Sequence, residues 1–320
     1  MDSICSREQK RAPKFSLYGQ KNNFCCQSRT SVAEITMENK ENVLEFELCS
    51  FPPALFDSSG LPLEARKPAL RDALCSYYKG VGEVDGLPAG NYYFVIDGGS
   101  LLQRIPWIRG TSISDIIAQY CKHVTSKYGS AYVVFDGYSA SLSTKDTTHM
   151  RRNGGAGIKI NFDLKSTLHT CKELFLANKN NKQRFIHFLS QTSGHITKHA
   201  VHGPDVDIVM TAFELSTEQE TVVIEDTDLL CLMCAHFQSS YKNVYFTSAK
   251  QEGKVYCIRS LSASLGSNAP RLLFAHALLG CDTTSRVYGI GKSVALKKLQ
   301  SEEFQKIADI FLLVPHKKTV

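Results

Sequence analysis

Aspartates follow three apolar runs of the chain at the point where each run ends. Asp97 ends NYYFVID, Asp136 ends AYVVFD, and Asp226 and Asp228 follow VVIE and VVIEDT. Short apolar runs that alternate with helical patterns predict buried strands of a parallel sheet. Ligands of open α/β sheets bind outside the carboxyl ends of the strands, so we expect these carboxylates to meet at one edge.

Further acids belong to the same expected edge. Asp205 and Asp207 lie in GPDVD, where Pro204 predicts the first turn of a helix, and Asp282 follows the helical stretch 271–280. Carboxylates a few ångströms apart raise one another's pKa, so the group needs counter-charge. Hard oxygen donors favour Mg²⁺ or Mn²⁺ over zinc. Two such ions about 3.5–4 Å apart would stabilise the attacking and leaving oxygens of a phosphoryl displacement.

A simpler interpretation stays open for single residues of this group. An aspartate after a strand is often the N-cap of the next helix, and Asp97 or Asp136 alone fits that role. The whole group is harder to explain by capping. Glu225 is left out because alternation along a strand points it to the opposite face from Asp226.

The patterns around these acids predict an α/β protein. Apolar spacing predicts a helix near 111–127, LLCLMCAHF predicts a helix after VVIEDTD, and NVYFTSA predicts a strand at 243–249. Strands and helices in this order imply a mostly parallel sheet covered on both faces.

Three regions of the chain differ in pattern. Residues 1–40 are polar without a sustained period and are expected to form a disordered tail. Residues 41–88, with a short strand, a proline turn and a helix at 64–78, are expected to be an N-terminal extension. Residues 89–320 carry the α/β pattern.

Composition narrows the class of protein. No apolar run reaches the roughly 18 residues of a membrane span, and residues 1–30 lack the apolar stretch of a signal peptide. We therefore expect an intracellular protein with no membrane association. The net charge is +6, and acids gathered at one edge would leave the remaining surface more basic still.

Two other patterns suggest zinc only weakly. Cys231 and Cys234 form one isolated C-x-x-C pair with no second pair at the usual spacing, so buried helix positions are favoured. His195, His199 and His202 lie close together in the sequence, but no glutamate completes an H-E-x-x-H motif, so surface or phosphate-facing imidazoles are favoured.

Trp107, in a separate segment, is expected to pack against other side chains or anchor a turn rather than stack on a base.

The ordered motifs VIDGG, VVFDGY, GPDVD, VVIEDTDLL, LLGCDTTSR and GIGKSVALKKL, over roughly 91–300, resemble those of the PIN-like flap-endonuclease superfamily. The nearest resemblance is to a transposon-derived animal branch. It implies a three-layer PIN-like fold with a central mostly parallel sheet, a basic arch insertion and a C-terminal helix–two-turn–helix within 89–320. It implies a two-metal nuclease of the nucleus rather than the cytoplasm, acting on structured DNA rather than RNA. The implied ligands of two Mg²⁺ or Mn²⁺ ions, direct or through water, are Asp97, Asp136, Asp205, Asp207, Asp226, Asp228 and Asp282.

The resemblance also assigns the basic segment STKDTTHMRRNGG at 143–155 to the arch. Lys145 and Arg152 are seven residues apart, so two helical turns would place them on one face. With Arg151 close behind, they are the expected catalytic cations that hold the scissile phosphate. A solvated basic loop is the alternative.

The motif GIGK resembles the turn of the family's helix–two-turn–helix. Backbone N–H groups at such a glycine turn and helix start grip a duplex phosphate. The expected nucleic-acid-binding residues are therefore Gly289, Gly291 and Lys292.

Some features depart from the family pattern. Asp205 and Asp207 stand where the family usually has glutamates, and their shorter reach favours ligation through water. A long segment precedes Asp97, so flap-specific cleavage is not implied. The chain stops soon after the glycine turn, so part of the duplex-binding surface is expected to be missing.

Two other functions compete with a nuclease. One is a catalytically weak PIN-like module that binds nucleic acid, although such a module gains nothing from many acids beside phosphate. The other is a haloacid-dehalogenase-like phosphatase, which expects D-x-D at the first strand. The sequence there is Asp97-Gly98-Gly99, which argues against it.

Overall fold

The computed structural model describes residues 55–57, 63, 68–78, 80–137, 157–200, 203–224, 227–248, 254–281, 284–286 and 296–313. The chain divides into two compact units, Met1–Leu61 and Pro62–Val320, and the second carries every element below. The predicted tail over 1–40 lies outside the described residues. Among the described helices, none has the length and apolar character needed to cross a membrane.

One seven-stranded sheet organises the second unit, in the order β1-β9-β8-β7-β2-β4-β6. Neighbours from β8 to β6 run parallel, whereas β9 is antiparallel to both β8 and β1. This mostly parallel sheet confirms the predicted α/β class. Its strands are β1 (Glu83–Asp85), β2 (Tyr93–Asp97), β4 (Ala131–Phe135), β6 (Ile196–His199), β7 (Thr221–Ile224), β8 (Val244–Thr247) and β9 (Lys254–Cys257), and a separate two-stranded sheet pairs β3 (Thr111–Ser112) with β5 (Thr167–Leu168).

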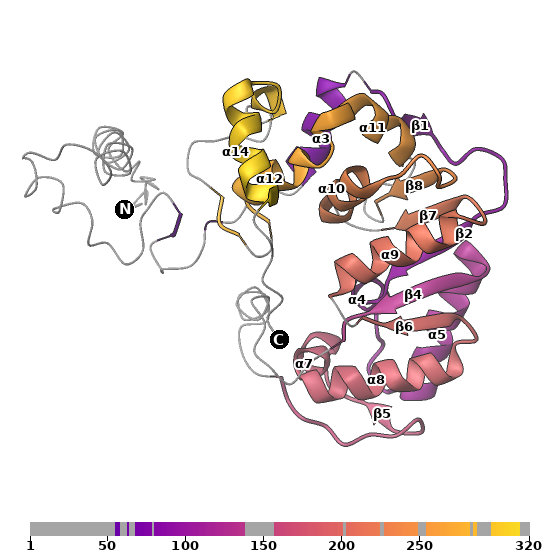
Figure 1. The fold of residues 1–320 in the computed structure, drawn as a ribbon. Coiled ribbons are helices and arrows are strands. Elements are labelled where there is room, and N and C mark those ends of the chain that lie inside the picture. The colour runs from indigo at the N-terminus through magenta and orange to yellow at the C-terminus, as the bar shows by residue number, and fades with distance from the viewer. Residues whose placement is uncertain are drawn as a thin grey trace, which may run out of the picture. The chain divides into compact units, whose positions relative to one another are not determined.

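Helices cover both faces of the large sheet (Figure 1). On one face lie α3 (Pro68–Tyr77), α9 (Pro204–Ser216), α10 (Thr227–His236), α11 (Ile258–Leu265), α12 (Arg271–Leu278) and α14 (Glu302–Leu313), with a 3-10 turn, η2 (Gly266–Asn268), after α11. On the other lie α4 (Gly98–Arg104), α5 (Ile113–Tyr128), α7 (Lys172–Ala177) and α8 (Lys179–Thr192).

Alternation along the strands divides the core between these two helical layers. In β2, Val95 packs with the α9 layer, and the next residue, Ile96, packs with the α5 layer. In β7, Val223 and Ile224 divide in the same way. Successive strand residues point to opposite faces, so a sheet buried on both sides reads as a continuous apolar run. The three-layer arrangement predicted from those runs is confirmed.

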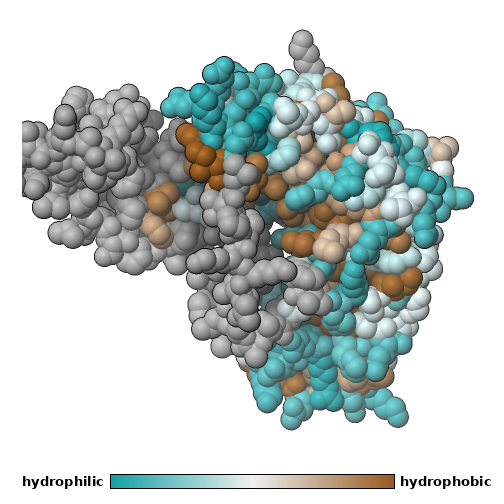
Figure 2. Space-filling view, in the orientation of Figure 1, coloured by the Kyte–Doolittle hydropathy of each residue, from teal (hydrophilic) through white to brown (hydrophobic). Residues whose placement is uncertain are grey.

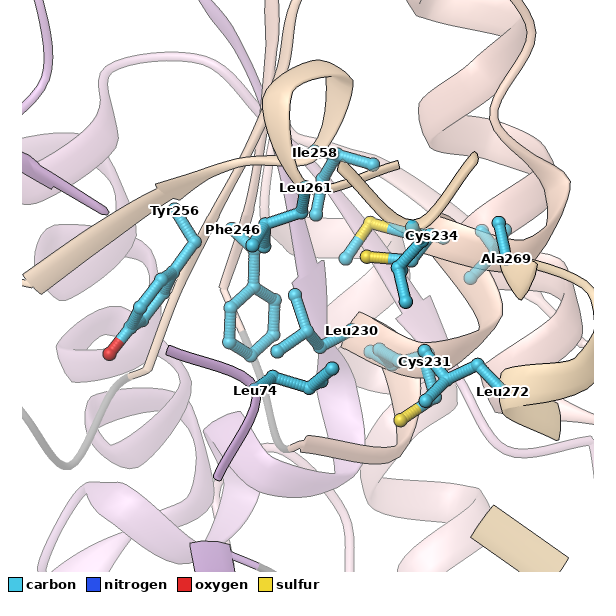
Figure 3. Packing of buried hydrophobic residues seen from close by; sticks show 14 of the residues in the cluster. Leu74, Leu230, Cys231, Cys234, Phe246, Tyr256, Ile258, Leu261, Ala269 and Leu272 are labelled. Atoms are coloured by element: carbon cyan, nitrogen blue, oxygen red, sulfur yellow. The ribbon is translucent and has the colours of Figure 1, made fainter. Parts of the chain in front are cut away.

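The α9-side core explains the C-x-x-C pair. Cys231 and Cys234 are at most 1% exposed, and Figure 3 shows their sulfurs among apolar side chains that include Leu230 and Leu272. A buried thiol behaves as a small hydrophobe. The interpretation of this pair as buried helix positions is confirmed.

The α5-side core contains Trp107. Its ring centroid lies 5.4 Å from that of Phe175 and 4.9 Å from that of Phe185. Its Nε1–H donates to the hydroxyl of Tyr120 at 2.9 Å. The predicted packing role of Trp107 is confirmed.

Strand β6 was not predicted, and the reason is its polarity. Its sequence ITKH is mostly exposed at the edge of the sheet. Edge strands often carry polar and charged residues, which lack the apolar run of a buried strand. His199 ends this edge strand, and His195 directly precedes it. The Nε2 atom of His195 lies 3.2 Å from Thr125 Oγ1. His202 lies outside the described residues.

The surface differs between the two layers. Figure 2 shows mainly hydrophilic residues over the region of α8 in the lower part of the view. Helix α14 instead exposes Ile307, Ile310 and Phe311, which are 50%, 65% and 45% exposed.

Candidate metal centre

Four neighbouring parallel strands carry the described acids to one edge of the sheet. Asp97 ends β2, and Asp136 directly follows β4. Asp228 lies in the first turn of α10, after β7, and Asp205 and Asp207 lie in the first turn of α9, after β6. Because β7, β2, β4 and β6 are adjacent and parallel, their carboxyl ends share an edge.

Asp97 and Asp136 face a common point beside Gly99. A Cβ built on Gly99 would lie 3.2 Å from Asp97 Oδ1 and 3.6 Å from Asp136 Oδ2. The carboxylates reach this point because Asp97 is paired in register with Val134, two residues before Asp136. Glycine leaves the space between them open, so two hard oxygen donors converge on a small cradle.

Asp97 also caps α4, as the simpler interpretation allowed. Its Oδ1 accepts a hydrogen bond from the Gly99 N–H at 2.7 Å. A carboxylate offers about four lone-pair sites, so one capping bond leaves acceptor capacity for a cation. Capping and ligation are therefore compatible for Asp97.

Lys182 supplies a cation to this pair of acids. Its Nζ donates to Asp136 Oδ2 at 3.2 Å, and its side chain is only 11% exposed. Lys182 lies on the same face of α8 as the buried Phe185, Ile186 and Leu189, so packing of that face carries the ammonium to the edge. A half-buried carboxylate pair repels itself, and the ammonium offsets that repulsion.

His276 approaches the edge from the opposite layer. Its Nε2 lies 3.3 Å from Asp228 Oδ1, and the two side chains are 10% and 15% exposed. The imidazole comes from α12, which packs against α10. Lys182 thus contacts Asp136 from the α5 side of the sheet, and His276 approaches Asp228 from the α9 side.

The start of α9 favours negative charge at Asp205 and Asp207. Pro204 occupies the first turn, after Gly203 at a φ of 120°. Helix N-termini stabilise nearby anions, and Asp207 is 4% exposed while Asp205 is half-buried. The predicted helix start near 204–205 is confirmed.

The described residues that flank segment 138–156 lie near this edge. Gly137 follows Asp136, and a Cβ on it would meet the carbonyl oxygen of Ala200 at 1.8 Å. This close backbone approach requires glycine after Phe135-Asp136. At the returning end, the buried Asn181 accepts from the Ile160 N–H at 3.0 Å and donates to the Ile158 carbonyl at 2.8 Å. The described chain therefore stops next to Asp136 and resumes at Gly157, beside the helix that carries Lys182.

The remaining predicted residues fall outside the described part of the chain. The two carboxylates that converge on the open point beside Gly99 are hard oxygen donors of the kind that a divalent cation prefers. Among the described residues, no three His, Cys, Asp or Glu side chains group closely enough to hold a metal ion. The predicted site residues outside the described ranges are Asp226, Asp282, Lys145, Arg151, Arg152, Gly289, Gly291 and Lys292.

Sequence reasoning missed Lys182, His276 and Gly99. Lys182 had a usable signal, because it stands three, four and seven residues before the apolar Phe185, Ile186 and Leu189. A lysine in register with an apolar helix face is expected to be partly buried and paired. His276 carries no such signal, since its meeting with Asp228 depends on the packing of two helices.

No family model and no curated protein matches the sequence. Solved structures with a similar backbone include the three below, each covered over about half to two thirds of its own length. For the catalytic core of Rad2 in complex with DNA substrate, identity is 15%, coverage is 71% of this chain and 66% of that chain, and the TM-score is 0.44. For a second complex of that core with DNA substrate, identity is 14%, coverage is 66% of this chain and 61% of that chain, and the TM-score is 0.40.

The third structure is the Holliday junction-resolving enzyme GEN1 in complex with product DNA and Mg²⁺ ion. It has 13% identity over 67% of this chain and 47% of that chain, with a TM-score of 0.34. The similarity to these structures lies in the backbone fold.

Proposed function

We propose that this chain is a divalent-metal-dependent nuclease that hydrolyses phosphodiester bonds in structured DNA. The observation that carries the proposal is the convergence of Asp97 and Asp136 on one open point beside Gly99. Acids placed together at the carboxyl edge of a parallel sheet destabilise the fold unless they bind a cation.

Each acid of the edge has a proposed role as an oxygen donor to one of two Mg²⁺ or Mn²⁺ ions. Bound ions of this kind polarise a phosphoryl oxygen and lower the pKa of a bound water. The chain's own contribution is position, because the adjacent parallel strands β2, β4, β7 and β6 lead to Asp97, Asp136, Asp228, Asp205 and Asp207. The proposed ligands are Asp97, Asp136, Asp205, Asp207, Asp226, Asp228 and Asp282.

Basic residues around the edge would hold the nucleic acid. The segment with Lys145, Arg151 and Arg152 runs in the sequence from Gly137 to Gly157. Gly137 follows Asp136, which Lys182 contacts, and the Gly157 carbonyl accepts from Asn178 at the start of the helix that carries Lys182. We propose that these cations grip the scissile phosphate. A second contact with the duplex, through Gly289, Gly291 and Lys292, would fix the distance between that contact and the cleaved bond. We propose a nuclear location because the proposed substrate is DNA.

A catalytically weak nucleic-acid-binding module is the second candidate. The observation in its favour is the ion pair between Lys182 and Asp136. In a site that has lost its metal, a lysine would neutralise the remaining carboxylates. Such a module would bind DNA without cleaving it.

The test is cleavage of labelled flap, hairpin, nicked and single-stranded substrates in Mg²⁺ or Mn²⁺. We expect cleavage of at least one structured substrate, its loss with a chelator, and a fall of at least about 100-fold with Asp136→Asn. Asp85→Asn is the matched control, because Asp85 lies exposed on β1 at the other end of the sheet. Metal-independent cleavage, or equal rates for both variants, would overturn the proposal, and binding without cleavage would favour the weak module.

A further inference from the structure

We propose that Lys182 competes with metal for Asp136, and that metal binding transfers its ammonium to a phosphate of the nucleic acid. This inference rests on the proposed function and deepens it. One lysine would neutralise the acids before metal arrives and contact the substrate afterwards. Metal loading and substrate binding would then be coupled through a single side chain.

The first step of the argument is the place that the ammonium occupies. Lys182 Nζ contacts Asp136 Oδ2, the same oxygen that lies 3.6 Å from the Cβ position of Gly99. Asp97 Oδ1 lies 3.2 Å from that position. The ammonium therefore contacts an oxygen that lies toward the cradle, and a divalent ion bound there through this oxygen would stand next to the ammonium.

The second step is electrostatic. Lys182 is 11% exposed and Asp136 is 24% exposed, so water screens their attraction only in part. A divalent ion beside Asp136 would repel a neighbouring ammonium, since like charges in a poorly solvated site strongly disfavour each other. Metal binding must therefore either be weakened by Lys182 or displace it.

The third step is where a displaced ammonium would go. Lys182 lies in the first turns of α8, four residues after the N-cap Asn178. At that end of the helix, Asn178 Nδ2 donates to the carbonyl of Gly157 at 3.2 Å, and Gly157 is the first described residue after the segment that carries the expected phosphate-binding cations. A lysine has a flexible four-carbon stem and acts as a movable point charge for phosphate. A phosphate drawn to the metal edge would stand within reach of this side chain.

The proposal predicts opposite effects of one substitution. Removing the charge in Lys182→Met removes the competitor, so Mn²⁺ affinity should rise about tenfold, in line with the effect of a neighbouring charge on a titrating group. It also removes a phosphate contact. DNA binding in Ca²⁺ should weaken, and the slope of log K against log salt should fall by about 1. In chelator, where Lys182 remains with Asp136, the slope should not change.

The experiment combines Mn²⁺ calorimetry with salt-dependent binding of a labelled hairpin DNA. Lys182→Gln repeats the loss of charge with a polar side chain in case the Met variant folds poorly. Lys122→Met, exposed on α5, is the matched control and should behave as wild type. Unchanged or weaker Mn²⁺ binding by both Lys182 variants, or an unchanged slope in Ca²⁺, would overturn the inference. Absence of Mn²⁺ binding by the wild type would instead overturn the proposed function on which it rests.

Discussion

The imidazole of His276 stands 3.3 Å from the carboxylate of Asp228, and both side chains are at least 85% buried. They come from α12 and α10, so the approach depends on how these two helices pack. A buried group that contacts a metal-binding carboxylate fixes its orientation, and loss of such support typically weakens metal binding about 10- to 100-fold. His276 is therefore expected to position Asp228.

The substitution His276→Leu tests this relationship. We expect Mn²⁺ affinity to fall about tenfold because the Asp228 carboxylate loses its buried neighbour. His276→Gln, which restores an N–H at a similar distance from the backbone, should recover most of the loss. Titration calorimetry measures both, and a thermal melt checks folding. Equal Mn²⁺ affinity in the Leu variant and the wild type would contradict the positioning role.

Gly99→Ala tests the cradle between the two acids. The new Cβ would stand 3.2 Å from Asp97 Oδ1 and 3.6 Å from Asp136 Oδ2. Alanine suits a helix better than glycine, so the folded state should be little affected. Mn²⁺ binding and cleavage should both fall, by about tenfold, because the methyl group narrows the space between the carboxylates.

Gly98→Ala is the matched comparison for that variant. Its Cβ would come within 2.2 Å of Phe135 Cδ1, in the fully buried α5-side core. Overpacking of this kind destabilises a fold by about 1–3 kcal/mol. Chemical denaturation should therefore show a clear loss of stability for Gly98→Ala and little loss for Gly99→Ala. The reverse order would show that Gly99 serves packing rather than the site.

The pair Arg271–Asp309 gives a prediction for acid conditions. Arg271 donates from Nε and Nη2 to the two carboxylate oxygens of Asp309 at 2.7 and 2.9 Å, which ties α12 to α14. These hydrogen bonds lower the pKa of Asp309 below its ordinary value of 3.8. Between the folded and unfolded values the unfolded chain binds more protons, so stability rises with pH there.

The contribution of Asp309 is thus present above about pH 3.8 and disappears as pH falls through its folded pKa. Urea denaturation should show Asp309→Asn less stable than wild type at pH 6, with the difference shrinking in more acidic buffer. A difference that grows toward acid would contradict the assignment. Because Asp309 lies at the surface, the effect at any pH is expected to be small.

The sequence predicted those parts of the structure that follow from local pattern. Buried strands such as β2 and β7 are continuous apolar runs, and the start of α9 is marked by proline followed by acids. Strand β6 was missed because an exposed edge strand has no apolar run. Cys231 and Cys234 were assigned to the core because their spacing and apolar neighbours fit a buried helix.

The candidate site was predictable only in its acids. The carboxyl ends of adjacent parallel strands lie at one edge of a sheet, so the strand-terminal Asp97 and Asp136 could be placed together from the sequence alone. The side-chain partners of the acids come from distant parts of the chain, Lys182 on α8 and His276 on α12. The apolar helix face around Lys182 gave a local signal of its burial, but which carboxylate each side chain contacts depends on tertiary packing.

The most direct test of the central claim is the number of Mn²⁺ ions bound, measured by calorimetric titration of the wild type and Asp136→Asn. We expect two ions for the wild type, and at most one, bound more weakly, for the variant. Identical titrations, or no saturable binding by the wild type, would contradict the claim that this edge of the sheet is a metal centre.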